Sequence, residues 1–197
     1  MKRIKNKEIK FLNKKQLSKL LKSIENTKET NKFYLRDLTI YHLSYYCWLR
    51  ISEISIIKRE NYNKQTKEIY IKRLKWSLNS TIKLDKKREQ VLNKYLREYN
   101  ILEDWYLFTT KTWKQITKPT LEFLTNKYKE LSKLKDFHFH MLKHSIAVHL
   151  LEAWLTIFEL KNYLWHKSIN STLVYSSFTP QMSNEMYEKI NKWAFLV

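Results

Sequence analysis

The stretch from His140 to Tyr175 concentrates side chains that can take part in chemistry. It reads HMLKHSIAVHLLEAWLTIFELKNYLWHKSINSTLVY and carries Lys143 and His166 between its two ends. Histidine transfers protons near neutral pH, lysine supplies a positive charge, and tyrosine can act as a covalent nucleophile. The spacing of these four residues, rather than any one of them, is the most informative feature of the chain.

The histidines also allow a metal site. His140 and His144 stand four residues apart, a spacing that chelates zinc on a helix, and His138 is close by. No cysteine lies near them, and the glutamate of the H-E-x-x-H zinc motif is missing. We therefore expect no metal here and interpret His144 as a packed structural histidine.

The chain is strongly basic. It holds 38 Lys and Arg against 19 Asp and Glu, a formal net charge of +19. Such a charge favours association with polyanions, nucleic acid first. Because Lys, Asn, Ile and Tyr are abundant together, an A/T-biased gene is an alternative source of much of this charge.

The 197 residues fit one domain with a real core. Cys47 is the only cysteine, so no intramolecular disulfide can form, as in a reducing cytoplasm. Residues 1–15 are basic without a following apolar stretch, unlike a signal peptide, and no run of about 18 apolar residues predicts a membrane span. We expect a cytoplasmic protein.

The hydrophobic spacing predicts a mainly α domain with a small antiparallel β-sheet. Apolar residues at helical or alternating spacing define the expected elements. Helices are expected over 15–24, 34–48, 52–58, 86–99, 120–132, 140–152, 156–164, 169–178 and 181–193, and strands over 68–73 and 79–84, with residues 106–108 as a short extended piece.

Five segments resemble, in chain order, the sequence boxes of the catalytic domain of tyrosine recombinases, the phage integrase family. They are Trp48-Leu49-Arg50-Ile51-Ser52-Glu53 (G-L-R-x-S-E in the family), Arg73-Leu74-Lys75 in the expected hairpin, His140-Met141-Leu142-Lys143-His144 (H-x-L-R-H), Leu164-Trp165-His166 (L-G-H) and Tyr175. The resemblance covers about residues 12–185, and five boxes in order are far more specific than any one of them.

The resemblance implies a site-specific recombinase or integrase of a mobile element, which cleaves and rejoins duplex DNA without metal, ATP or any cofactor. It implies a basic leader over residues 1–11 and a catalytic domain over residues 12–197, with no N-terminal core-binding domain. The expected partners are duplex DNA at recombination sites and further copies of the chain in a homotetramer. A topoisomerase-like relaxing enzyme would use the same cleavage chemistry.

The resemblance also implies a role for each site residue. Tyr175 is the expected nucleophile that forms a 3′-phosphotyrosine. Arg50 would bind nonbridging phosphate oxygens, and Lys75 would protonate the leaving 5′-oxygen, although Lys72 and Arg73 are nearby. His140 would assist proton transfer at Tyr175. In addition, His166 would bind the phosphate or stabilise the transition state.

Lys143 departs from the family pattern, which has arginine there. Lysine keeps the charge but loses the bidentate fork. Because every other catalytic position is filled, we expect activity. A catalytically silent DNA-binding relic or regulator is the alternative.

The other departure is the absence of glycine beside seven tryptophans. Trp48 and Trp165 occupy the glycine positions of their boxes, and Trp76, Trp113 and Trp154 fall in expected turns, while Trp105 precedes a short strand. Tryptophan disfavours positive φ, whereas glycine accepts it. We hypothesise that most of these residues are glycines in the source organism, encoded by UGA and translated with the wrong table; UGG codons at Trp48 and Trp165 would exclude this. A divergent protein that repacks around real tryptophans is the alternative.

Overall fold

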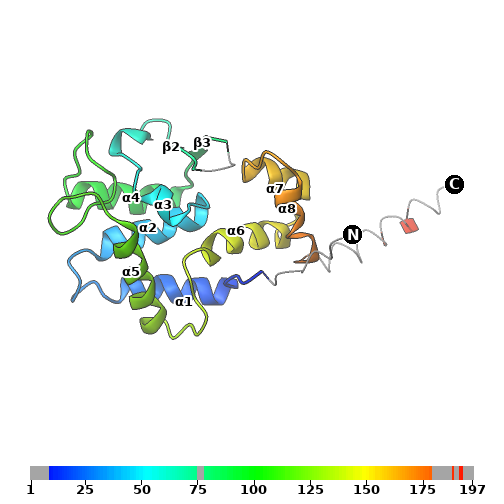
Figure 1. Cartoon of the computed structure of the whole chain (residues 1–197), viewed down its shortest axis with the longest axis horizontal. Helices are drawn as coiled ribbons and strands as arrows, with labels where there is room; N and C mark the ends of the chain where they lie inside the picture. Colours follow the sequence, from blue (N-terminus) through cyan, green and yellow to red (C-terminus); the bar gives the residue numbers. More distant parts are fainter. Residues whose placement is uncertain (1–8, 75–77, 179–187, 189–190, 193–197) are drawn as a thin grey trace.

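The computed structural model describes residues 9–74, 78–178, 188 and 191–192, and this part of the chain is mainly helical with a small sheet (Figure 1). The helices are α1 (Lys14–Glu25), α2 (Tyr34–Tyr46), α3 (Ile51–Ile54), α4 (Lys86–Glu98), α5 (Lys118–Leu131), α6 (Met141–Glu152), α7 (Ile157–Tyr163) and α8 (Asn170–Leu173), with 3-10 turns η1 (Arg59–Asn61) and η2 (Ser176–Phe178). The strands are β1 (Tyr62–Asn63), β2 (Glu68–Ile71) and β3 (Ser80–Lys83). The predicted fold class is confirmed.

Helix α2 forms the centre of the molecule. Every residue from Leu35 to Tyr45 is buried, and the helix packs against α1, α4 and α6. A helix that is buried on all sides needs mainly apolar or satisfied residues around its circumference. In the segment LRDLTIYHLSY, Leu and Ile are apolar, and Arg36 and Asp37 pair with each other. In Figure 1, α2 and α6 lie between α1 at the bottom and the sheet and α7 at the top.

The sheet is antiparallel in the order β1-β2-β3. Ile69 of β2 pairs with Ile82 of β3, and both side chains face the core. The alternation of buried and exposed residues along β3 is the pattern of a strand with one face on the core. The two predicted hairpin strands are thus confirmed, although both are shorter than expected.

Two expected helices are interrupted. The one expected over 52–58 ends at Ile54, because Ile57 accepts a backbone hydrogen bond from Leu107 and Lys58 forms a β-bridge with Tyr106. The one expected over 169–178 breaks after α8, where Tyr175 makes an i to i−3 bond and turns into the core. The expected helix over 181–193 falls almost entirely outside the described residues.

None of the helices in the described part of the chain is long and apolar enough to cross a bilayer.

Three tryptophans end helices in left-handed turns. Trp48, Trp154 and Trp165 follow α2, α6 and α7, with φ values of 43°, 73° and 51°. After α6, Trp154 N donates to Leu151 O, and the next backbone N–H donates to Leu150 O. This pair of bonds is the Schellman motif, whose left-handed residue is usually glycine. The same pair of bonds follows α2 and α7.

Trp113 also has a positive φ, of 61°. At these four tryptophans the backbone therefore has the left-handed conformation that glycine adopts most readily. For a bulky residue this is an outlier. Trp48 adds a second cost, because its buried indole N–H finds no hydrogen-bond partner among the described residues. Trp105 does not have positive φ, and Trp76 and Trp193 lie outside the described residues. These turns support the glycine hypothesis at Trp48, Trp113, Trp154 and Trp165.

Trp154→Gly is expected to raise the free energy of unfolding by about 1 kcal/mol. Glycine removes the clash of Cβ with the backbone in a left-handed turn, a cost of about 1–2 kcal/mol, and loses part of that gain to its larger unfolded-state entropy. Little packing is lost, because Trp154 is 52% exposed. Urea denaturation measures the change.

Trp154→Ala is the matched control for this prediction. Alanine also removes the indole but keeps Cβ, so the strain of the left-handed turn stays and stability should change little. Equal effects of glycine and alanine would contradict the strain argument.

Candidate active site

Glu53 is a fully buried carboxylate that joins two segments of the chain. It lies in the first turn of α3 and accepts a hydrogen bond from the backbone N–H of Arg50 at 2.9 Å. It also pairs with the guanidinium groups of Arg50 at 2.8 Å and Arg73 at 3.0 Å. The backbone N–H of Leu74 donates to it at 3.3 Å. Glu53 therefore ties the start of α3 to the end of the β2 segment.

The electrostatics of Glu53 follow from this arrangement. Burial alone would raise the pKa of its carboxyl group. The backbone hydrogen bond from Arg50 and the charge of Arg73 outweigh burial, and the pKa is lowered. Glu53 is thus a charged structural partner of the two arginines.

Arg73 is a structural cation. Its side chain is buried, and besides Glu53 it donates to Cys47 O at 3.0 Å and Ser80 Oγ at 3.1 Å. Its guanidinium also stands 4.7 Å from the centre of the Trp48 ring. With its donors used in this way, Arg73 does not compete for the role expected of Lys75, which itself lies outside the described residues.

Arg50 stands at the N-terminus of α3, two residues after the left-handed turn at Trp48. Its Nη1 donates to Glu53 and to Leu74 O, the latter at 3.2 Å. These bonds fix the guanidinium in one orientation, while its side chain stays 23% exposed. Arg50 is therefore a cation of fixed orientation that is partly exposed to solvent. These properties suit it to binding a phosphate group.

Lys143 is a buried cation on α6, only 5% exposed. Burial, followed by the positive charge of Arg50, lowers the pKa of its ammonium group to about 8. Lys143 therefore lies within electrostatic reach of Arg50, and it carries its charge at pH 7 but loses it as the pH rises through 8.

Tyr175 follows α8 and turns inward, where it is 2% exposed. Its hydroxyl lies 2.8 Å from Nδ1 of His144, and the His144 ring stands 4.6 Å from the His140 ring at nearly a right angle. Burial raises the pKa of the Tyr175 phenol, and the charge of Arg50 opposes that rise. Burial also lowers the pKa of His140, with Lys143 and Arg50 adding to the effect.

His166 comes directly after the left-handed turn at Trp165. Its Nδ1 lies 2.9 Å from Oγ1 of Thr172, a buried residue of α8. Burial, then the charges of Lys143 and Arg50, lower the pKa of the imidazole to about 4. His166 is thus neutral at pH 7 and lies near the same two cations.

The structure therefore gathers the described residues that the sequence singled out. Arg50 and Lys143 act electrostatically on His140 and His166, and Arg50 acts on Tyr175. Two cations, neutral imidazoles and a phenol in one place can bind a tetrahedral anion and attack it.

The sequence analysis interpreted His144 as a packing residue only, whereas in the structure it bonds to Tyr175. The signal in the sequence that could have indicated a functional role was its position four residues after His140.

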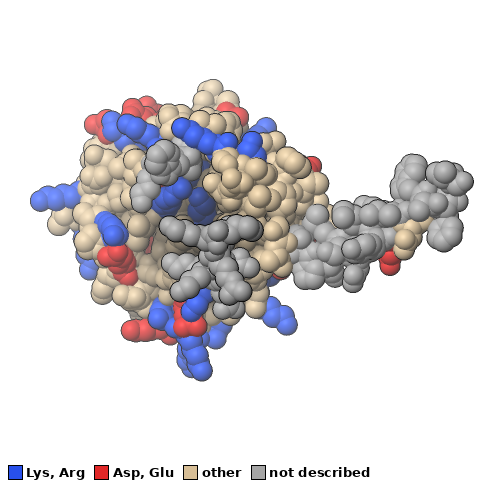
Figure 2. Space-filling view, turned by 45° about the vertical axis from the view of Figure 1, so that its right-hand side comes forward, with Lys and Arg blue, Asp and Glu red and all other residues tan. Residues whose placement is uncertain are grey.

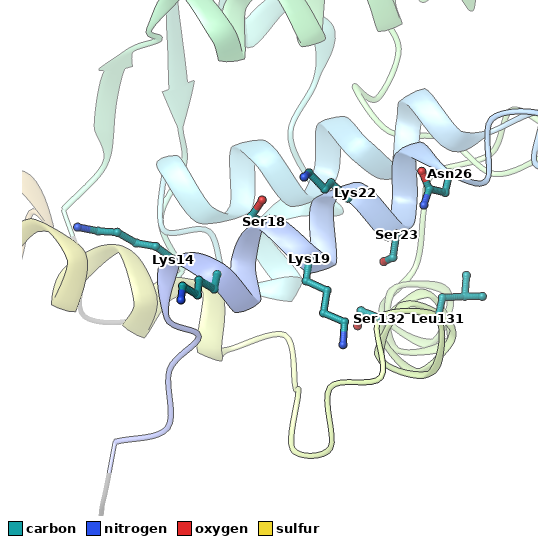
Figure 3. A pocket seen from close by; sticks show the side chains of 9 residues that line it. Lys14, Ser18, Lys19, Lys22, Ser23, Asn26, Leu131 and Ser132 are labelled. Atoms are coloured by element: carbon teal, nitrogen blue, oxygen red, sulfur yellow. The ribbon is translucent and has the colours of Figure 1, made fainter.

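Two further features of the described residues concern the predicted absence of a metal site and a surface groove of the molecule. Among the described residues, no three His, Cys, Asp or Glu side chains come together as metal ligands would. An open groove runs between α1 and the end of α5 (Figure 3), and none of the residues expected to do chemistry lines it. Its walls are formed by Lys14, Lys15, Ser18, Lys19, Lys22, Ser23, Asn26, Leu131 and Ser132.

Comparison with known proteins gives a consistent result. The model of the Phage integrase family matches residues 10–182. A tyrosine recombinase of Pseudothermotoga lettingae is 27% identical over 158 residues, which are 80% of this chain and 54% of the relative. The chain thus spans little more than half the length of that relative.

Solved structures agree on the fold. XerH site-specific recombinase bound to palindromic difH substrate superposes with a TM-score of 0.77 and 23% identity, over 92% of this chain and 53% of that one. The catalytic domain of bacteriophage HP1 integrase superposes with a TM-score of 0.67 and 18% identity, over 92% and 95%.

Glu53→Gln is expected to lower the free energy of unfolding by about 3–5 kcal/mol, because it leaves the buried charge of Arg73 without its partner. Thermal or urea denaturation measures the loss. The matched control is Glu60→Gln, which breaks the exposed Lys58–Glu60 pair and should cost about 0–1 kcal/mol. Similar losses in the two variants would show that Glu53 is not the structural centre of this site.

Proposed function

The chain belongs to the phage integrase family, and on that premise we propose that it is a tyrosine-type site-specific recombinase that cleaves and rejoins duplex DNA through Tyr175. The observation that carries the proposal is the grouping of His166 with two cations, Arg50 and Lys143, and of Tyr175 with Arg50 and His144. The net charge of +19 supports a polyanionic substrate. Lys and Arg predominate over Asp and Glu on the face shown in Figure 2.

In the proposed reaction the Tyr175 oxygen attacks a phosphorus atom of one DNA strand. A bond from the phenol oxygen to phosphorus forms, and the bond from phosphorus to the 5′-oxygen breaks. The phenol proton is lost to a base, and the leaving 5′-oxygen takes up a proton, so the products are a 3′-phosphotyrosine and a free 5′-hydroxyl. The phosphodiester energy is conserved, and attack by a 5′-hydroxyl rejoins the strand without ATP.

The positive groups stabilise the charge that develops on the phosphoryl oxygens. We assign nonbridging oxygens to Arg50 and Lys143, and His166 to a hydrogen bond with the same phosphate. His140 assists proton transfer near Tyr175. Lys75 protonates the leaving oxygen, an assignment that rests on the family resemblance because this residue lies outside the described part.

Recombination of two duplexes requires more than one active site. We propose that four copies of the chain assemble on paired recombination sites of a mobile element in the cytoplasm. The DNA-binding part of this proposal is supported by the relatives, which are tyrosine recombinases, and by XerH, which is solved with DNA.

A silent DNA-binding module of the same fold is the second candidate. Lys143 in place of arginine favours it, because lysine lacks the bidentate fork. Such a module would bind DNA in a salt-sensitive way and form no covalent adduct.

Tyr175→Phe is expected to abolish covalent adduct formation on a nicked duplex that traps cleaved strands, because phenylalanine has no nucleophilic oxygen. A denaturing gel measures the protein–DNA adduct. Tyr45→Phe is the matched control, since Tyr45 is a buried tyrosine that also bonds to a histidine of α6. Salt-sensitive binding without any adduct from the native chain would instead support the silent module.

The rate of adduct formation at subsaturating DNA is expected to fall about tenfold between pH 7 and pH 9. Lys143 has a pKa of about 8, so its charged fraction falls as the pH rises through that value, and subsaturating rates report the free protein. Lys143→Arg should stay active to higher pH, because arginine keeps its charge.

Lys129→Arg, a change in the last turn of α5, is the control for that pH profile. It should decline as the native chain does. A native profile that Lys143→Arg leaves unchanged would mean that the charge of Lys143 is not used.

A further inference from the structure

The hydroxyl of Tyr175 is held by His144 and not by His140. Nδ1 of His144 lies 2.8 Å from the hydroxyl oxygen, and the two ring centres are 5.7 Å apart. His144 follows Lys143 directly on α6, and its ring packs edge-on against His140. The contact therefore joins the nucleophile to the helix that carries Lys143 and that begins directly after His140.

The direction of this bond follows from the protonation states of the two groups and from the acceptors available to the hydroxyl. Burial, with the neighbouring His140 and Lys143, lowers the pKa of His144 to about 4. Burial also raises the pKa of Tyr175. Both groups are neutral at pH 7, and among the described residues Nδ1 of His144 is the only acceptor within hydrogen-bond distance of the Tyr175 hydroxyl. A buried hydroxyl proton needs an acceptor, so we assign the hydroxyl as the donor to Nδ1 and place the imidazole proton on Nε2.

We propose that His144 is a positioning residue for the nucleophile: it accepts the hydrogen bond of the Tyr175 hydroxyl and so fixes the phenol oxygen beside the cations of the site. The inference rests on the proposed function, since it assigns His144 a part in the cleavage by Tyr175. A phenol that rotated freely would sample many orientations, and fixing one of them lowers the entropic part of the barrier.

The fold contains a matched pair for comparison. His149, also on α6, lies 2.9 Å through its Nδ1 from the hydroxyl of Tyr45, and both residues are buried. Both are histidine–tyrosine bonds from the same helix. Only the His144 pair includes the proposed nucleophile, so a merely structural role predicts similar effects from breaking either bond, and a positioning role does not.

The first test measures the single-turnover rate of adduct formation with saturating nicked duplex. His144→Ala should slow the rate at least tenfold while the Kd for DNA stays unchanged. His144→Asn should recover most of the rate, because its amide oxygen can accept the Tyr175 hydrogen bond near the position of Nδ1. His149→Asn should cleave at the native rate.

The outcomes separate the two proposals. If the native chain forms an adduct and His144→Ala forms it equally fast, or if His149→Asn is slowed as much, the positioning role is overturned while the proposed function stands. If the native chain itself forms no adduct, the proposed function fails, and the positioning role fails with it.

A second measurement does not depend on cleavage. Nitrogen NMR of the DNA-free protein, with labelled histidine, should show His144 neutral at pH 7 with its proton on Nε2. Tyr175→Phe should shift the Nδ1 resonance of His144 and leave that of His149 in place. An unchanged His144 resonance would overturn the inference.

Discussion

The site depends on one buried carboxylate that is outnumbered by the cations around it. Glu53 compensates Arg50 and Arg73 through direct ion pairs, and Lys143 adds a third positive charge nearby. Three cations against one anion leave two positive charges in a mostly buried cluster, which is unfavourable without a further anion. Burial is the main cause of the lowered pKa of Lys143, and the charges of Arg50 and Arg73 add to it. A DNA phosphate would supply the missing negative charge, so the same imbalance that costs stability in the free protein favours binding of the proposed substrate.

The second constraint is the backbone of the turns that lead into the site. Arg50 lies two residues after the left-handed residue of the Schellman turn that ends α2. His166 lies one residue after the left-handed residue of the turn that ends α7. Each needs a left-handed residue, and each has tryptophan there. Glycine at these positions would relieve the strain and also remove the unpaired buried indole N–H of Trp48. The geometry of the site thus bears on what the gene encodes, because the fold requires at these two places the residue type that the sequence lacks.

Much of the fold could be predicted from the sequence, because the apolar residues of the long segments recur at a spacing that fits one type of secondary structure. The hairpin and the helix carrying Lys143 were predictable in this way, and the nucleophile was predictable from its distance to His166. The bond between His144 and Tyr175 was not, because it joins residues 31 positions apart and depends on the end of α8 two residues before Tyr175. The structural role of Arg73 could not be predicted either. The sequence alone does not show whether the side chain of an arginine in a hairpin lies in the core or in solvent.

The most direct test of the account is to map the covalent bond itself. The native chain is incubated with a nicked duplex, the adduct is digested, and mass spectrometry locates the tyrosine that carries the nucleotide among the 13 tyrosines of the chain. The account predicts a 3′-phosphonucleotide on Tyr175 alone. An adduct on another tyrosine, or none from a folded protein that binds the same duplex, would contradict it.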